Sequence, residues 1–339
     1  MDKLFIGFTA LGYKQIIMYF IGGLLIYLAI KKDYEPMLLL PIGFGAILAN
    51  LPLSTVIDYE GTPGVLKILL DAGITTELFP VLIFIAVGAM IDFTPLFKNP
   101  SMLFFGAAAQ FGIFATIILV LLLGIDDLKV ASAIGIIGAA DGPTSIFVAT
   151  RFARKYLGPI TVAAYSYMSL VPIIQPPVIK LLTTKKERMI RMEYKDAEVS
   201  KTVKVLFPIF VTIISGIIAP ISVPLVGLLM FGNLIRESGV LERLSKAAQN
   251  ELANIVTLLL GITIGSTMLA DDFLHPTTLL ILLAGLGAFI FDTAGGVLFA
   301  KLLNLFLKNK INPMVGAAGI SAFPMSARVI QKMAHKEDP

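Results

Sequence analysis

The chain has 339 residues, of which 57% are hydrophobic and only 15% are charged. Soluble domains are about 45–50% apolar and about 25% charged, so this composition excludes an ordinary water-soluble protein. The absence of cysteine excludes disulfides and thiolate chemistry. The net charge of +4 matches the basic loops of membrane proteins and gives no reason to expect a nucleic-acid partner.

Apolar runs long enough, or nearly so, to cross a bilayer recur along the chain. A hydrocarbon core of ~30 Å needs about 20 apolar residues in a helix. Lys31 and Lys32 follow the first run in place of a cleavage site, which favours a retained anchor. The pattern predicts an all-α, polytopic transmembrane helix bundle with about 10–11 membrane segments. The longest runs are 15–30, 102–124, 205–231 and 277–300.

Two short motifs share one pattern of helix-breaking residues. IGIIGAADGPTS (134–145) and VGAAGISAFPMS (315–326) align without a gap, 181 residues apart. Gly and Pro free backbone groups that a membrane tolerates only where they line a cavity or bind an ion. Small-residue packing faces are the alternative, but two Pro–Ser pairs in register favour a site. The aligned residues are Gly135, Gly138, Pro143 and Ser145 with Gly316, Gly319, Pro324 and Ser326.

The motifs divide the chain into two similar halves. We predict a first transmembrane repeat over 1–157 with its broken helix at 138–145 and a second over 205–339 with its broken helix at 316–326. A connecting span and a basic, cytoplasmic loop occupy 158–204. Internal repeats of this kind are typical of secondary transporters. The sequence leaves open whether the repeats are inverted, because basic residues at 151–155 complicate the orientation count.

Asp141 is the strongest candidate functional residue. It lies in AADGPT, within an apolar stretch, where an ionisable group is costly and therefore functional by default. Its carboxylate, freed carbonyls and the hydroxyls of Thr144 and Ser145 form an oxygen-only ligand set that suits a hard cation. We predict ion binding or proton handling here. The alternative is that Asp141 only caps a half-helix.

Other polar residues in apolar stretches are more ambiguous. Asp292 (FIFDTAGG) either acts in function or holds the bundle together. Asn50 and Asn233 occupy equivalent positions of the repeat, and we weigh equally a helix-to-helix hydrogen bond and a metal-ligand role. Tyr165 and Tyr167 form either an interfacial aromatic pair or a proton relay near Asp141.

Two cations near the ends of apolar runs complete the candidates. Lys180 follows PIIQPP, an irregular stretch that contains Gln175, and either snorkels to the surface or contacts a cofactor. Arg328 lies two residues after Ser326 and either snorkels or holds an anionic group. The chain contains no G-x4-G-K-[ST] loop, which argues against ATP as its direct energy source. It also contains no Met-Lys-Met biotin attachment sequence.

Four long stretches resemble a known family, the β subunits of the sodium-pumping biotin-dependent decarboxylases, which serve oxaloacetate, methylmalonyl-CoA, glutaconyl-CoA and malonate decarboxylases. The similarity runs from about residue 37 to the end. The stretches are GAADGPTSIFVA (138–149), AAYSYMSLVPIIQPPVIKLLT (163–183), FDTAGGVLFAKLLNLF (291–306) and NPMVGAAGISAFPMSARV (312–329).

The resemblance implies a membrane subunit that decarboxylates carboxybiotin, couples this to Na+ export and consumes an external proton. It implies a separate carboxyltransferase α subunit, a biotin carrier protein that holds the biotin, a small single-span γ/δ-type subunit, a homo-oligomer within the complex and a bacterial inner membrane. The family's functional positions fall on Asp141, Tyr167, Asn312, Gly316, Ser321 and Arg328.

These positions give a hypothetical mechanism. Asp141 and Ser321 would bind sodium in alternation with protons, with Asn312 as a further ligand and Gly316 allowing close backbone approach. Tyr167 would pass the external proton, and Arg328 would hold the carboxylate or ureido oxygen. The rival hypothesis is a sodium- or proton-coupled solute carrier that performs no chemistry.

Overall fold

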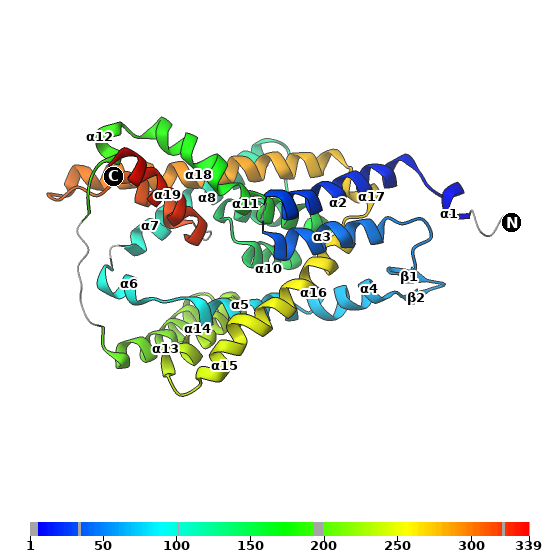
Figure 1. Cartoon of the computed structure of the whole chain (residues 1–339), viewed down its shortest axis with the longest axis horizontal. Coiled ribbons are helices and arrows are strands. Elements are labelled where there is room, and N and C mark those ends of the chain that lie inside the picture. The colour runs from blue at the N-terminus through cyan, green and yellow to red at the C-terminus, as the bar shows by residue number, and fades with distance from the viewer. Residues whose placement is uncertain (1–5, 33–34, 101, 193–198, 321–322, 339) are drawn as a thin grey trace. The chain divides into compact units, whose positions relative to one another are not determined.

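A computed structural model describes residues 6–32, 35–100, 102–192, 199–320 and 323–338 (Figure 1). The chain forms two compact units, each built from two separate stretches. Unit 1 contains residues 1–98 and 197–274, and unit 2 contains residues 99–196 and 275–339. Each unit therefore contains segments from both sequence repeats. The repeats are intertwined and do not form separate bodies.

Unit 1 holds the first three segments of each repeat. From the first repeat it takes α1 (Ile6–Thr9), α2 (Tyr13–Lys32), α3 (Pro36–Ala49), the hairpin β1 (Asp58–Tyr59) and β2 (Thr62–Pro63), α4 (Val65–Leu69), the π-helix η2 (Leu70–Thr75), α5 (Leu78–Met90) and α6 (Thr94–Lys98). From the second it takes α13 (Lys201–Ile218), the 3-10 turn η5 (Pro220–Ser222), α14 (Val223–Ser238), α15 (Glu242–Ala247), the π-helix η6 (Ala248–Leu252), α16 (Ala253–Ser266) and α17 (Ala270–Phe273).

Unit 2 holds the last two segments of each repeat and the helix that connects the repeats. From the first repeat come α7 (Met102–Ala109), α8 (Phe111–Leu122), α9 (Leu128–Gly135), the 3-10 turn η3 (Ile136–Ala139) and α10 (Gly142–Phe152). The 3-10 turn η4 (Arg154–Tyr156), α11 (Leu157–Leu182) and α12 (Lys185–Arg188) follow, and the second repeat adds α18 (Pro276–Phe306), the 3-10 turn η7 (Pro313–Gly319) and α19 (Phe323–Glu337).

Equivalent segments of the two repeats match in local structure. Each third segment starts with a short α-helix, continues through a π-helical stretch (η2 or η6) and ends as an α-helix, α5 or α16. Each fifth segment is interrupted by a 3-10 stretch, η3 or η7. Gly or Pro is present in η2, η3 and η7 and disfavours a regular α-helix there, whereas η6 (AQNEL) contains neither residue. The predicted breaks at 138–145 and 316–326 each overlap one of the 3-10 stretches, at 138–139 and at 316–319.

The repeats run in opposite directions, which the sequence left open. In unit 1, α4 packs on α16 while η6 packs on α5, so the two third segments are antiparallel (Figure 1). In unit 2, Phe105 of α7 contacts Phe299 of α18, and Gly112 of α8 contacts Asp292 further back along α18. The fourth segments are therefore antiparallel as well, and the repeats are inverted.

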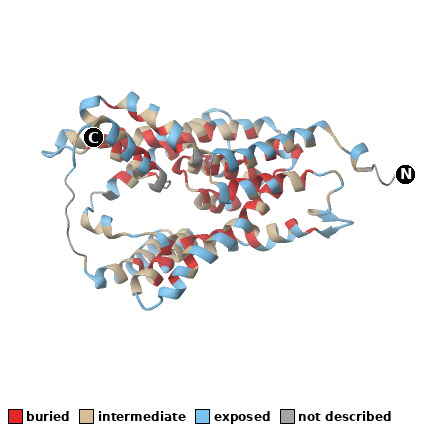
Figure 2. Ribbon diagram, viewed as in Figure 1, coloured by how far each residue is buried: buried red, intermediate tan, exposed pale blue. Residues whose placement is uncertain are grey.

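The length and composition of the helices fit a membrane. Among the described residues, six helices are long and apolar enough to span one, or up to eight if each of two bent pairs is one span. Two shorter apolar helices, Pro36–Ala49 and Leu128–Ala139, add to these. Exposed side chains along many helices are apolar, as on α13, where Ile217 and Ile218 are each 77% exposed (Figure 2). The predicted all-α polytopic bundle is confirmed.

Candidate functional site

The first break is centred on Asp141. Ala140 has a positive φ of 50° and reverses the chain after η3, and Asp141 then caps the first turn of α10. Its Oδ1 accepts a hydrogen bond from the backbone N–H of Thr144 at 3.2 Å, and its Oδ2 accepts one from the Thr144 hydroxyl at 2.5 Å. Ser145 donates its hydroxyl to the Asp141 carbonyl at 2.8 Å. The capping role is therefore observed, and ion binding stays a prediction.

The break is only partly shielded from its surroundings. Asp141 and Thr144 are half-buried, while Gly142 and Ser145 are buried. The ring of Tyr165 lies where a side chain on Gly142 would be, since an added Cβ would come within 2.1 Å of two ring carbons. Glycine at 142 is thus required by the close approach of Tyr165, which places this aromatic ring beside the residue that follows Asp141.

The second break is built differently. Ser326, which aligns with Ser145, donates its hydroxyl to the carbonyl of Ala317 at 3.0 Å and to Gln175 Oε1 at 2.7 Å. Gln175 Nε2 donates to the same carbonyl at 3.0 Å. All three groups are buried. Helix α11 thereby supplies a side chain to the second break. Ser321 lies outside the described residues.

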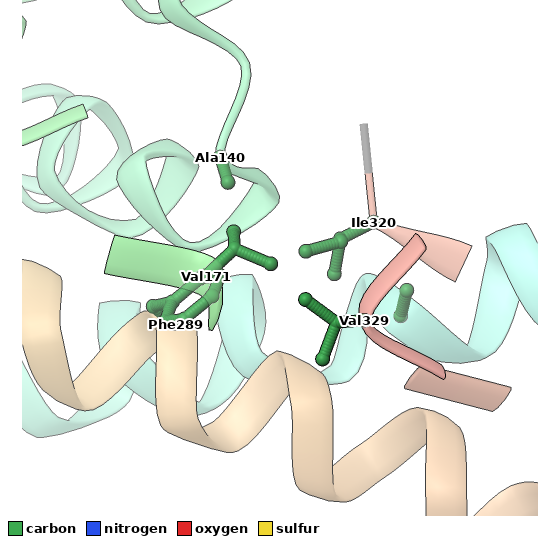
Figure 3. Packing of buried hydrophobic residues seen from close by; sticks show 6 residues of the cluster. Ala140, Val171, Phe289, Ile320 and Val329 are labelled. Atoms are coloured by element: carbon green, nitrogen blue, oxygen red, sulfur yellow. The ribbon is translucent and has the colours of Figure 1, made fainter. Parts of the chain in front are cut away.

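The two breaks meet in one hydrophobic cluster of unit 2. Figure 3 shows Ala140, just before Asp141, and Ile320, just after η7, in one cluster with Val171 and Phe289. Val329 of α19 closes the cluster, and Tyr167 packs against it. The phenol of Tyr167 donates a hydrogen bond to the carbonyl of Leu282 in α18. The inverted repeats therefore bring their broken segments together, as expected for a transporter site.

Asn312 and Gly316 lie in the second broken segment. Asn312 caps η7 by accepting from the Met314 N–H at 3.1 Å, and it donates to the carbonyls of Arg188 at 2.7 Å and Ile190 at 3.2 Å. Gly316 packs directly on the backbone of Gly296 in α18. The close backbone approach expected of Gly316 is therefore present, and its partner is a neighbouring helix. Their role as ligands stays a prediction.

Asn50 and Asn233 form an equivalent pair of contacts in unit 1. Asn50 donates to the carbonyls of Ala46 and Met268 at 2.8 and 2.7 Å and accepts from the Ala270 N–H at 2.8 Å. Asn233 donates to the carbonyls of Ile91 at 2.8 Å and Gly88 at 3.4 Å. Each asparagine thus fastens the second segment of its own repeat to the end of the third segment of the other repeat.

The two candidate cations are at the surface. Arg328 of α19 and Lys180 of α11 are both exposed, and neither forms an ion pair within the described residues. Both are available to a partner from outside the chain, as a cofactor-contacting role requires.

Asp292 is the residue that sequence reasoning weighted too lightly. Its side chain is 0% exposed and lies between Gly112 of α8 and Gly138 of η3. Gly138 is three residues before Asp141 in the sequence. Gln175 was noted only as part of an irregular stretch, although it contacts the second break. A polar residue flanked by prolines or glycines inside an apolar run was the available signal in both cases.

The fold and the site define a class of protein. Inverted repeats with broken helices that meet within the protein are the architecture of ion-coupled membrane transporters. In the described part of the chain, no three His, Cys, Asp or Glu side chains cluster as a transition-metal site would require. The donors at the Asp141 break are oxygen atoms, which hard cations prefer. The chain is a multi-pass membrane protein with the features of a cation transporter.

Comparison with known proteins identifies the family. Residues 14–339 match the profile of the Na+-transporting oxaloacetate decarboxylase beta subunit, and the chain belongs to this family. It is 51% identical to the glutaconyl-CoA decarboxylase subunit beta of Acidaminococcus fermentans and 52% identical to the methylmalonyl-CoA decarboxylase subunit beta of Veillonella parvula, in each case over 98% of this chain and 87% of the relative. It is 45% identical to the oxaloacetate decarboxylase beta chain 2 of Salmonella typhi over 98% of this chain and 90% of the relative. The chain is thus a membrane subunit of a decarboxylase sodium pump, which confirms the resemblance seen in the sequence.

Proposed function

We propose that this subunit decarboxylates carboxybiotin presented by a carrier protein and couples that step to Na+ export, with consumption of an external proton. A carboxyltransferase α subunit and the biotin carrier would work with it, together with a small single-span γ/δ-type subunit. The complex would lie in a bacterial cytoplasmic membrane and contain more than one copy of this chain. Biotin belongs to the carrier, since the chain has no Met-Lys-Met attachment sequence.

The observation that carries the proposal is the break at Asp141. The carboxylate of Asp141 and the hydroxyls of Thr144 and Ser145 lie together between the end of η3 and the start of α10, within a multi-pass membrane protein of a sodium-transporting family. Thr144 already orients both carboxylate oxygens, so the site is organised before a cation binds. A Na+ ion bound at Oδ2 would take the place of the hydrogen bond from the Thr144 hydroxyl, which keeps its proton, and its charge would compensate that of the carboxylate.

The other residues would act around this centre. Thr144 would share the cation with Asp141, and Asn312, Gly316 and Ser321 would supply or shape further sodium ligands on the second broken segment. Tyr167 would pass the external proton, because it packs against the cluster that contains Ala140. If Asn50 or Asn233 binds Na+, the ligand would be its side-chain amide oxygen, because the amide N–H groups of each already donate to backbone carbonyls.

Arg328 would bind the carboxylate or ureido oxygen of carboxybiotin, and Lys180 would assist it. Both side chains are exposed. A guanidinium binds a planar carboxylate through two parallel hydrogen bonds, which an ammonium cannot do, so Arg328 would carry the specificity and Lys180 only charge.

The test is reconstitution of the chain with its carrier and carboxyltransferase in vesicles. We expect decarboxylation of carboxybiotin to require Na+, to drive ²²Na+ uptake, to be blocked by avidin, and to be lost with Asp141→Ala. Asp126→Asn is the matched control, because Asp126 is an exposed carboxylate in the loop before α9. Normal coupled transport by the Asp141→Ala subunit would contradict the proposal.

The rival is a solute carrier without chemistry, which also fits inverted repeats with broken helices but does not fit membership of the decarboxylase family. A solute carrier would take up ²²Na+ in response to a solute gradient. It would do so in vesicles that lack the biotin carrier protein, and avidin would not block it. Neighbouring genes for a carboxyltransferase, a biotin carrier and a single-span subunit would favour the decarboxylase pump.

A further inference from the structure

The carboxyl group of Asp292 is buried without a partner. Asp292 lies in the middle of α18, its side chain is 0% exposed, and within the described residues neither carboxyl oxygen forms a hydrogen bond. Thr116 lies one turn beyond Gly112 on α8, and its hydroxyl is likewise buried without a hydrogen bond in the described part of the chain. Buried polar groups are rarely left in this state unless they serve a function.

Two glycines make the space that this carboxyl group occupies. A Cβ atom added to Gly112 would lie 2.3 Å from Asp292 Oδ1, and one added to Gly138 would lie 2.5 Å from Oδ2. Any side chain at either position would displace the carboxyl group. The pocket is therefore shaped for a carboxyl group by α8 on one side and by η3, the turn that leads to Asp141, on the other.

No positive charge faces this pocket from the elements that pack on α18. The segments α7, α8, η3 and η7 contain no titratable residue, α9 contains only Lys129 in its exposed first turn, and α11 contributes Tyr165, Tyr167 and the exposed Lys180. On α18 itself, Lys301 is engaged with the Leu182 carbonyl and Glu187. An isolated buried carboxylate would cost several kcal/mol, so this arrangement favours the protonated form of Asp292.

The first turn of α8 can stabilise the other protonation state. The N–H groups of Gly112 and Ile113 lie in the first turn of α8 and face the Asp292 carboxyl group, although neither completes a hydrogen bond with it in the described part of the chain. A small displacement of α18 along α8 would complete these bonds and favour the ionised form, which the helix dipole also favours. The protonation of Asp292 is thereby linked to how α18 packs on α8 and η3.

We propose that Asp292 is a second cation-exchange site of the pump, which binds a proton in the arrangement described and releases it when α18 shifts against α8 and η3. The O–H bond of the carboxyl group breaks, the proton passes to water, and a Na+ ion takes its place beside the carboxylate, which also accepts hydrogen bonds from the two amides. The Gly138 contact transmits the shift to the turn before Asp141. This site does not depend on the role proposed for Asp141.

The test is infrared difference spectroscopy on the full chain in lipid vesicles, with Na+ exchanged for K+ at constant ionic strength. Because the chain is measured without its carrier, failure of the decarboxylation proposal would not affect the result. We expect one protonated-carboxyl band, distinct from any band of Asp141, that changes with Na+ in the natural chain, in Asp126→Asn and in Asp141→Asn, and that is absent in Asp292→Asn. Survival of this band in Asp292→Asn, or the absence of any such band in the natural chain, would overturn the proposal.

Two further variants keep the test decisive if Asp292→Asn does not fold. Asp292→Glu should move the band to a glutamic acid frequency while it keeps its response to Na+. Gly112→Ala should shift the band and raise the Na+ concentration for half-response at least tenfold, whereas Gly287→Ala should change neither, because a Cβ at Gly287 meets no atom within 4 Å. An unshifted band in folded Gly112→Ala would also contradict the proposal.

Discussion

The polar groups buried in the two units differ in symmetry. In unit 1, Asn50 and Asn233 make equivalent contacts, each joining its own repeat to the other. In unit 2, the first break holds Asp141 with Thr144, whereas the second holds Ser326 with Gln175, which comes from outside the repeat. Symmetric polar contacts suit a framework that both repeats must share. Divergence between equivalent breaks indicates that each has its own task.

The largest expected effect concerns unit 2, where the two breaks differ. Asp141→Asn should lower Na+-coupled decarboxylation about 100-fold or more, the range for loss of a positioned proton-handling group. The amide preserves much of the cap on α10, since its oxygen can still accept from the Thr144 N–H. The rate is measured in reconstituted vesicles, with thermal unfolding as the control for folding. A loss of stability that accounts for the loss of rate would return Asp141 to a capping role.

The next effect concerns unit 1, where the two asparagines make equivalent contacts. Asn50→Ala and Asn233→Ala should each lower the free energy of unfolding by about 2–3 kcal/mol, because each leaves buried backbone groups without a partner. The two losses should be similar, and the Na+ concentration for half-maximal rate should stay unchanged. Denaturant unfolding in detergent and a Na+ titration measure the two quantities. A large rise in the half-maximal Na+ concentration would instead support the ligand role.

A smaller effect concerns the second break. Gln175→Ala and Ser326→Ala should each destabilise the chain, and the double variant should show a coupling of about 1 kcal/mol because the two side chains share one network with Ala317. Ser215→Ala is the control, since the Ser215 hydroxyl donates to the Thr212 carbonyl in its own helix and to no other group among the described residues. Additive losses for Gln175 and Ser326 would show that the network is not cooperative.

The smallest effect is expected outside the spans. Hydrogen bonding and the charge of Arg191 lower the pKa of Asp338 below its ordinary value of 3.8. Burial raises the pKa of Glu187, but hydrogen bonds from Thr184 and Lys301 outweigh burial and lower it overall. Because both pKa values are lowered on folding, these contacts stabilise the fold at neutral pH and are lost as the pH falls through the lowered values.

Hydrogen exchange of α19 should therefore be unaffected between pH 7 and pH 5, after correction for the intrinsic rate, and should accelerate only below about pH 4, near the ordinary carboxyl range. Arg191→Gln should remove the part of this response that Asp338 contributes. The same acceleration in Arg191→Gln as in the natural chain would show that this exposed pair contributes nothing.

The sequence by itself determined the class of fold and the family, and it predicted the two repeats and their breaks. Those conclusions follow from composition and from Gly and Pro positions, which act through the local backbone and through the cost of polar groups in lipid. Asp141 was found in the same way, as a charge in an apolar stretch.

The tertiary structure decided what depends on residues far apart in the chain. Only packing shows that the repeats are inverted and intertwined, that Asn50 meets Met268, and that Gln175 enters the second break. The surroundings of Asp292 were equally out of reach, because Gly112 and Gly138 lie more than 150 residues away in the sequence. Periodicity and motifs report local preference, whereas the partner of a buried polar group is set by which helices pack together.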